Sequence, residues 1–306
     1  MEKIIALLLA IVLLIPAMVL GGNIAFREIE GVDMISSLIY GANLAGNVEE
    51  DTICNDPITH EDKEKAMTKV NQSVYNMIIY QNEKFFIDLK GETNNSTPRT
   101  AVSLNGKDVA ALAEIIIEQE NVGQIKIAEG MYINASIKDV DFESIDNSSV
   151  RVKAVLAVDV TELKAEMEIA AKNAIANAEQ AMSELGVSGN EMVESALTVI
   201  PDTLYIASEF ILNDNGEFSY EIEHESMAIN KLSCEEVDVL FTTIDYFSKI
   251  GNAEEINEII AYALADALIG RAEDEKTGFA EAFFNLGATS YEFREVSGKT
   301  YFIIKM

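Results

Sequence analysis

The chain has 306 residues, of which 52 are acidic and 22 are basic, so its formal net charge is −30. A field of that sign repels nucleic acid and anionic lipid headgroups, whose binding requires clusters of Lys and Arg, and we therefore expect no nucleic-acid partner. Apolar residues make up 49% of the chain, which predicts a folded protein with a substantial core rather than a disordered one.

The first predicted element is a run without charged residues from Ile4 to Phe26. A helix of that length rises about 35 Å, which is enough to cross a hydrocarbon core of about 30 Å. We therefore predict a membrane anchor over residues 1–27, with the rest of the chain outside the cytoplasm because the positive charges of the start stay inside. The alternative is a signal peptide cut after Gly21 or Gly22, which would leave a secreted protein.

Residues 28–99 are predicted to form a mainly helical N-terminal segment. Asp33 is placed to cap a helix that runs through Asn43. Thr59, with Asp62 three residues later, is a capping-box start for a second helix. The apolar residues that follow recur at helical spacing and predict its buried face: Met67, Val70, Val74, Met77 and Ile78.

A polar stretch separates this segment from the rest of the chain. The sequence FFIDL at 85–89 predicts a short strand before it, and residues 91–99 form a loop rich in Asn, Thr and Ser. We place a boundary in that loop and predict an α+β domain over residues 100–306.

The first half of that domain is predicted to contain two helices and two strands. Asn105 and Asp108 have the spacing of a helix start. Apolar and polar side chains then alternate over 124–137 and over 150–160, which is the pattern of strands with one buried face. Residues 162–185 are rich in Ala, Glu, Lys and Met, and this composition predicts a long helix.

A hairpin is predicted next, with its first strand over 204–212 and its turn at Asp214-Asn215-Gly216. The return strand alternates, so that four side chains share a core face and four a water face. The predicted core face holds Phe218, Tyr220, Ile222 and His224. The predicted water face holds Glu217, Glu221, Glu223 and Glu225.

Two further helices and a last hairpin complete the predicted fold. The helices begin at capping boxes, Ser233 with Glu236 and Asn252 with Glu255. The hairpin strands run over about 288–296 and 299–305, with a turn at Ser297-Gly298. Helices between hairpins predict the α+β class, in which an antiparallel sheet built from hairpins packs against several amphipathic helices, after an N-terminal membrane helix.

The sequence offers no catalytic signature. Its two histidines, His60 and His224, do not belong to a zinc-binding H-E-x-x-H motif, and no nucleophile elbow or phosphate-binding glycine loop is present. His224 falls on a predicted apolar face, which favours a core histidine over a partner for a cysteine nucleophile. We therefore assign no catalytic, cofactor-binding or metal-binding residue, no cofactor and no enzymatic activity.

Carboxylates and cysteines leave two alternatives open. The densest acidic cluster is Asp139, Asp141, Glu143 and Asp146. A calcium loop needs Gly at its sixth position and an acid at its twelfth, and Ser144 and Val150 stand there, so a solvated strand end is favoured over a calcium site. Cys54 and Cys234 are the only cysteines, and we expect two buried free thiols in preference to a disulfide bridge.

The segments SLNGKDVAALAEIII and QIKIAEGMYINASIKDV carry a resemblance. A helix of this kind followed by antiparallel strands, behind a short membrane helix, resembles uncharacterised single-pass or secreted envelope proteins of Gram-positive bacteria. The similar pattern covers residues 100–230. The resemblance implies a location in the cell envelope, and it implies no activity and no functional residue.

The predicted function is that of a membrane-tethered extracytoplasmic binding or scaffolding protein of the cell envelope. Its partners would be the membrane, through the N-terminal helix, and an envelope protein or lipid. The alternative is a carrier of an apolar ligand such as lipid, held in a pocket between the sheet and the helices. A continuous apolar pocket above about 500 Å³ would favour the carrier, whereas apolar faces that close on each other would favour the scaffold.

Overall fold

The computed structural model describes most of the chain between residues 50 and 305. Described are residues 50–54, 56–88, 100–120, 124–128, 131–146, 148–161, 201–216, 219–248, 253–270 and 278–305, and single positions 36, 40, 43, 44, 48, 164 and 165. The predicted anchor lies outside these residues, and so do most of the helices predicted over 33–43 and 162–185. Within the part that is described, no helix has the length and apolar character needed to cross a bilayer.

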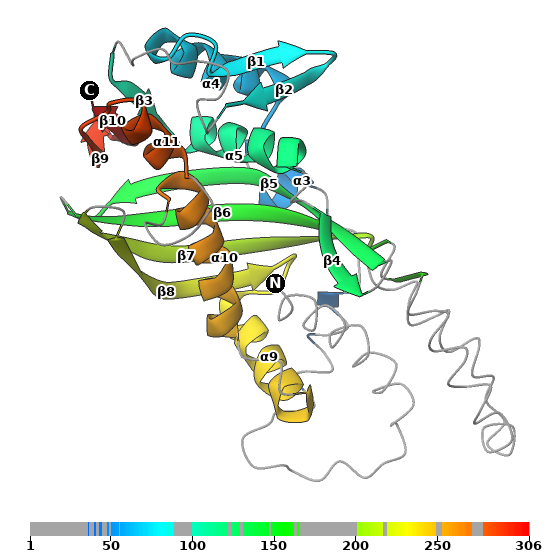
Figure 1. Cartoon of the computed structure of the whole chain (residues 1–306). Helices are drawn as coiled ribbons and strands as arrows, with labels where there is room; N and C mark the ends of the chain where they lie inside the picture. The colour runs from blue at the N-terminus through cyan, green and yellow to red at the C-terminus, as the bar shows by residue number, and fades with distance from the viewer. Residues whose placement is uncertain are drawn as a thin grey trace, which may run out of the picture.

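The fold is built on a five-stranded antiparallel sheet whose strands follow one another in sequence order (Figure 1). The strands are β4 (Gln124–Ala128), β5 (Met131–Ser144), β6 (Ser149–Asp159), β7 (Thr203–Gly216) and β8 (Ser219–Ile229). Together with the helices below, this arrangement confirms the predicted mixture of helices and antiparallel sheet.

Helices cover one face of this sheet, which we call the inner face. They are α5 (Gly106–Glu120), α9 (Cys234–Ser248), α10 (Ala253–Leu268) and the short α11 (Phe279–Asn285), and Figure 1 shows α10 crossing the strands. The alternation predicted for the strands is confirmed here. Val150 and Val152 of β6 and Phe210 and Leu212 of β7 are all buried beneath the helices.

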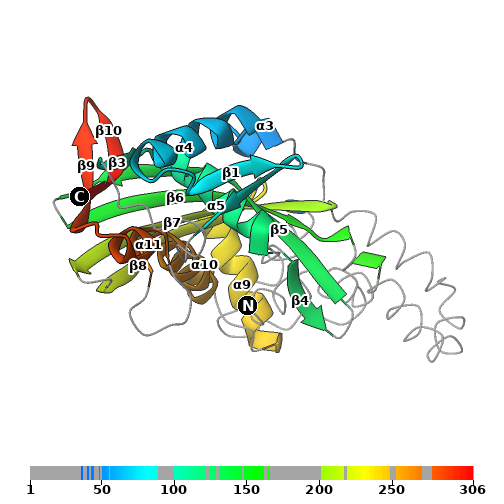
Figure 2. The same cartoon turned by 45° about the horizontal axis from the view of Figure 1, so that its top comes forward.

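Smaller elements pack beside α5 and complete the core (Figure 2). They are α4 (His60–Ser73), a hairpin of β1 (Ile78–Gln81) and β2 (Lys84–Ile87), and a sheet in the order β3 (Val102–Leu104), β10 (Lys299–Lys305) and β9 (Ser290–Val296). The short α3 (Glu50–Ile53) instead contacts β7. Val70 of α4, Ile115 of α5 and Phe302 of β10 belong to one continuous apolar cluster. Residues from both predicted segments, 28–99 and 100–306, therefore share one core.

Two predicted capping boxes and the helix start predicted at Asn105 are confirmed in their geometry, whereas Asn252 of the third predicted box lies outside the described residues. The Thr59 amide donates to Asp62 Oδ2 at 3.0 Å at the start of α4, and the Asn105 amide donates to Asp108 Oδ2 at 2.9 Å just before α5. The Ser233 amide likewise donates to a carboxylate three residues on, at the start of α9. Each box satisfies backbone donors that a helix start leaves without partners.

The N-terminus of α5 lies against the backbone of β5. A Cβ atom at Gly106 would stand 2.1 Å from the Val140 carbonyl oxygen, so only glycine permits this approach. This close packing fixes the position of the α5 N-terminus against β5.

The helix predicted through Ile78 ends earlier, at Ser73. The Asn71 side chain accepts a hydrogen bond from the Ile78 amide at 2.9 Å and donates to the Ile78 carbonyl at 2.6 Å. Asn76 has φ of 56°, which reverses the chain between them. Met77 and Ile78 are buried as predicted, but they reach the core from the start of a hairpin rather than from a helix.

Two strand predictions were wrong at their ends. The strand predicted over 124–137 divides into β4 and β5, and β5 continues to Ser144. The turn predicted at Asp214–Gly216 is wrong, because β7 runs through Gly216, which pairs with Ser219. Tyr291 donates to Asp214 Oδ1 at 2.9 Å and holds this residue in the extended strand. Glu217 and Phe218 lie outside the described residues.

The last hairpin forms where it was predicted. Ser297 and Gly298 have φ of 55° and 78°, and two successive positive φ values make the tight turn whose twist suits paired strands. Residues on the strands either side pair in register from Val296 with Lys299 to Ser290 with Lys305.

Candidate functional site

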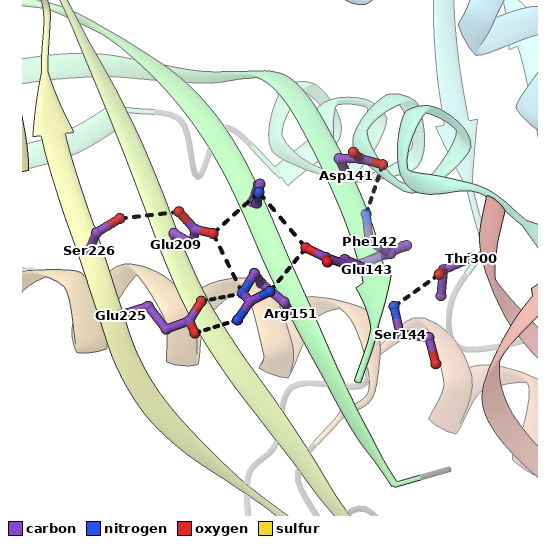
Figure 3. Close-up of polar contacts among 10 residues, drawn as sticks. Asp141, Phe142, Glu143, Ser144, Arg151, Glu209, Glu225, Ser226 and Thr300 are labelled. Carbon is purple, nitrogen blue, oxygen red and sulfur yellow. Dashed lines mark hydrogen bonds and ion pairs between the residues drawn. The ribbon is translucent and has the colours of Figure 1, made fainter. Parts of the chain in front are cut away.

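The face of the five-stranded sheet opposite α5, α9, α10 and α11, which we call the outer face, carries a group of charged side chains, most of which are carboxylates. Strand alternation places its residues there: Asp139, Asp141 and Glu143 on β5, Arg151 and Lys153 on β6, Glu209 on β7, and Glu221, Glu223 and Glu225 on β8. In Figure 3 the labelled charged residues of β5 to β8 lie on one side of the strands, with the helices behind. Among the residues just named, seven carboxylates accompany two cations, Arg151 and Lys153.

Arg151 is the centre of the outer face. Its Nε and Nη2 donate to the two carboxylate oxygens of Glu225, at 2.5 and 2.8 Å, and its Nη1 donates to Glu143 at 3.0 Å (Figure 3). A guanidinium forked onto a carboxylate fixes direction as well as distance. One side chain of β6 thus links β5 to β8 across the intervening β7.

Lys153 extends this network toward the other end of the strand. Its Nζ lies 3.3 Å from Glu209 of β7 and 3.9 Å from Glu143 of β5. Ser226 of β8 donates its hydroxyl to the other oxygen of Glu209 at 3.2 Å. Charged and polar side chains therefore connect four neighbouring strands without a break, and we call this set the ionic ladder.

The Arg151–Glu225 pair at the centre of the ionic ladder favours its charged forms. Hydrogen bonding to Glu225 and then to Glu143 raises the pKa of Arg151, and the same hydrogen bond from Arg151 lowers the pKa of Glu225. Both shifts favour the ionised forms. Because its charged groups keep fixed partners, the ladder is a pre-organised surface.

A bulge in β8 lies directly under the ladder. Glu209 pairs with Ser226 and the next residue, Phe210, pairs with His224, so Glu225 is the extra residue. A bulge leaves backbone amide and carbonyl groups without their usual partners on the neighbouring strand. The Glu225 side chain lies on the outer face, where Arg151 binds it.

Asn257 of α10 satisfies this bulge from the inner side. Its Nδ2 donates to the Glu209 carbonyl at 3.0 Å and lies 2.7 Å from His224 Nδ1, while its Oδ1 accepts from the Ser208 hydroxyl at 2.5 Å. Since an amide nitrogen only donates, His224 Nδ1 accepts in this arrangement. His224 is on the predicted inner face, and its ring contact is with a fully buried asparagine.

A second bulge, in β5, is satisfied in the same way by α5. Ladder pairing shifts between Ile137 and Asp139, and the Ile137 amide donates to Glu114 Oε2 of α5 at 2.9 Å. The Lys138 carbonyl accepts from the Ile58 amide at 3.1 Å and contacts the thiol of Cys54 at 3.6 Å. α5 and α10 thus each reach one of these two bulges with a polar side chain.

The two cysteines are free thiols in different surroundings. Cys54 is buried, and burial together with nearby carboxylates, Asp139 first among them, raises the pKa of its thiol. A thiol that stays protonated is a weak nucleophile. Cys234 is exposed at the first position of α9, which corrects the expectation that both thiols are buried.

The predicted acidic cluster is a strand end followed by a turn. Asp139, Asp141 and Glu143 alternate along β5, and Asp146 accepts from the amides of Ser148 and Ser149 at 2.8 Å in the turn to β6. Across the described ranges, no group of three or more His, Cys, Asp or Glu side chains is arranged to hold a metal ion.

A small apolar cavity lies between α5, α10, α11 and the inner face. Its volume is about 40 Å³, and the hollow around it, counted out to open solvent, is about 540 Å³. The enclosed part is the space that a bound ligand would occupy, and it is far smaller than the 300–1,000 Å³ typical of ligand pockets. The lining includes Leu112, Ile116, Phe210, Leu268 and Phe279.

Comparison of the chain with protein-family models, with curated proteins and with solved structures finds no match.

Proposed function

We propose that the chain is a membrane-tethered binding or scaffolding protein of the cell envelope, which acts outside the cytoplasm. In this proposal the outer face binds an envelope protein that presents basic side chains. The observation that carries the proposal is the ionic ladder, a pre-organised polar surface that continues over four strands on the face opposite the helices. The tether is the uncharged run from Ile4 to Phe26.

Charge supports this choice of partner. Arg151 and Lys153 are engaged by Glu143, Glu209 and Glu225, whereas Glu221 and Glu223 of β8 are exposed. An exposed acidic row beside a rigid network attracts basic side chains and sets the direction from which they approach.

Packing of the inner face favours a scaffold over a lipid carrier. The apolar stripes that would have lined a pocket close on each other and enclose only about 40 Å³. A carrier of an acyl chain would have to open this core, which costs dispersion and hydrophobic contacts.

Native mass spectrometry tests the proposed partner. The full chain is extracted from its own host in nanodiscs, and we expect it to carry a second protein at fixed stoichiometry. The double variant Glu221→Gln with Glu223→Gln should lose that protein. The matched control, Glu235→Gln with Glu254→Gln, removes the same charge from exposed helix positions and should retain it. Equal retention by both variants, or co-purified lipid without protein, would contradict the proposal.

Membrane retention tests the tether separately. The full chain should remain with membranes after a carbonate wash, because a helix that spans the bilayer is not removed by high pH. Mature protein in the medium that begins near Gly22 or Asn23 would contradict the anchor and favour a secreted form.

A further inference from the structure

Strand β8 forms one edge of the five-stranded sheet, as Figure 1 shows. Its register with β7 is uninterrupted from Tyr220 to His224, up to the bulge at Glu225, and these five residues have the length of an ordinary strand. Among the residues that the structure describes, no strand pairs with the far side of this stretch. An edge strand presents a row of backbone N–H and C=O groups, which is a template for one more strand.

The direction of the backbone groups at this edge follows from β7. The Asp214 amide of β7 donates to the Ser148 carbonyl at 2.8 Å, so Asp214 turns its backbone groups toward β6. These groups alternate in direction along a strand, and the neighbouring Asn213 therefore turns its own toward β8, where it pairs with Glu221. The same alternation directs the N–H and C=O groups of two residues of β8 away from β7: Ile222 and His224.

The side chains on the two faces of this edge differ in kind. On the outer face Glu221 and Glu223 are exposed, two residues apart. On the inner face Ile222 packs on the core but is only half-buried, and the Tyr220 ring centre lies 6.2 Å from that of Tyr262 on α10. A strand laid beside β8 therefore meets carboxylates with every second side chain and apolar groups with the side chains between.

We propose that the edge of β8 binds an extended segment of the partner protein, which adds a sixth strand to the sheet and alternates Lys or Arg with apolar residues. Its basic side chains lie beside Glu221 and Glu223, and its apolar side chains lie beside Ile222. Backbone hydrogen bonds supply affinity in this mode of recognition, and the alternating side chains supply specificity. The inference rests on the proposed function, which places a basic partner at the outer face, and adds the conformation and residue pattern of that partner.

The acidic row favours a basic partner over a second copy of the chain. Pairing of β8 with β8 of another copy would set glutamates opposite glutamates on one face, and like charges across a ladder are destabilising. Charged side chains on edge strands commonly protect proteins against self-association. The two carboxylates of this stretch, Glu221 and Glu223, repel a copy for that reason, and the same row attracts a basic strand.

Backbone amide exchange tests the pairing residue by residue. The full chain in detergent micelles is mixed with the peptide acetyl-KVKIKVK-amide, and exchange with solvent is followed by NMR. In the free chain the amides of Ile222 and His224 should exchange fast, whereas those of Glu221 and Glu223 should exchange slowly because they face β7. With the peptide at about ten times its dissociation constant, the fast pair should slow about tenfold, because only unbound protein exchanges.

Peptide order and protein charge provide matched controls. The peptide acetyl-KKKKVVI-amide has the same composition and charge but does not alternate, and it should leave the Ile222 amide unprotected. Glu221→Gln with Glu223→Gln should weaken binding of the alternating peptide about 2- to 30-fold, because two cross-strand charge pairs are lost. Glu235→Gln with Glu254→Gln, at exposed helix positions, should leave its binding unchanged.

Three outcomes would overturn the inference. If the alternating peptide leaves the Ile222 and His224 amides fast, or the block peptide protects them equally, β8 does not pair with a basic strand. The proposed function then still stands if a host protein co-purifies and is lost with Glu221→Gln and Glu223→Gln, and it fails separately if none co-purifies. If the two amides are already slow in the free chain at every concentration, another part of the chain covers the edge. If they slow as the protein concentration rises, a second copy covers it.

Discussion

Replacement of Asn257 by Ala tests whether α10 is fixed to the sheet through the β8 bulge. Asn257 is fully buried, and its amide serves the Ser208 hydroxyl, the Glu209 carbonyl and the His224 ring. Truncation to alanine takes the hydrogen-bond partner away from all three groups at once. We expect Asn257→Ala to destabilise the protein, although alanine is itself the better helix former.

The expected magnitude follows from the two groups that cannot recover a partner. Ser208 is 2% exposed and the Glu209 carbonyl lies at the bulge, so neither is free to turn to water, whereas the His224 ring is half-buried and can rehydrate. A buried polar group that loses its partner costs about 1–3 kcal/mol. Two such groups, less about 0.5 kcal/mol for the gain in helix propensity, give a loss of about 2–5 kcal/mol.

Urea unfolding of the full chain in detergent micelles, followed by circular dichroism, measures this loss. Glu254→Ala is the control, because Glu254 is exposed one turn earlier on the same helix. Its unfolding free energy should change by less than about 0.5 kcal/mol. If Asn257→Ala shifts the urea midpoint no more than Glu254→Ala does, the bulge contact does not hold α10 and the reasoning is refuted.

Further predictions concern the second bulge, the sheet register, the ladder and ligand binding. Burial raises the pKa of Glu114 above its ordinary 4.5, so its charged form opposes folding at neutral pH and this penalty disappears as pH falls through the folded-state pKa. Glu114→Gln should therefore be neutral or stabilising at pH 7, and any gain should vanish in acid. Glu114→Ala leaves the Ile137 amide without an acceptor and should cost about 1–3 kcal/mol. A Gln variant that is less stable than the natural protein at pH 7 would refute this. Ile222→Asp should lower the free energy of unfolding by about 2–3 kcal/mol, because Ile222 packs on the core. Glu221→Lys should change it by less than about half a kcal/mol, because Glu221 is exposed. Equal effects of the two changes would mean that the strand register is wrong. Arg151→Gln should raise the pKa of Glu225 toward its ordinary value in an NMR titration, because Arg151 is what lowers it, and an unchanged pKa would mean that the pair does not persist in solution. If the protein is a scaffold, fatty acid should leave its melting temperature unchanged. A carrier with its ligand at about 100 times the dissociation constant would gain about 2.7 kcal/mol of stability, and its melting temperature would rise by about 2–4 °C. Such a rise would favour the carrier.

The sequence alone determined the features that depend on residues a few positions apart. Capping boxes such as Thr59 with Asp62 are local, because the side chain and the amide that it satisfies belong to one helix turn. The turn at Ser297-Gly298 and the alternation along β6 are local for the same kind of reason. The α+β class follows from these elements and their order.

Only the tertiary structure decided where strands bend and which polar residues meet. Ile78 lies at helical spacing after Val70 and Val74, yet it pairs in a hairpin because Asn71 binds its backbone. Both bulges depend on partners far along the chain, since Glu114 lies 23 residues from Ile137 and Asn257 lies 48 residues from Glu209. No local pattern indicates such a pairing.

The candidate site illustrates the same division. Alternation predicted that Glu221, Glu223 and Glu225 share a water-facing side, which the described β8 confirms for the first two as exposed residues. It did not predict that Arg151, 74 residues away, binds Glu225. That contact requires the strand order that places β6 and β8 on either side of β7, and residue pairs so far apart in the chain are not indicated by any local sequence preference.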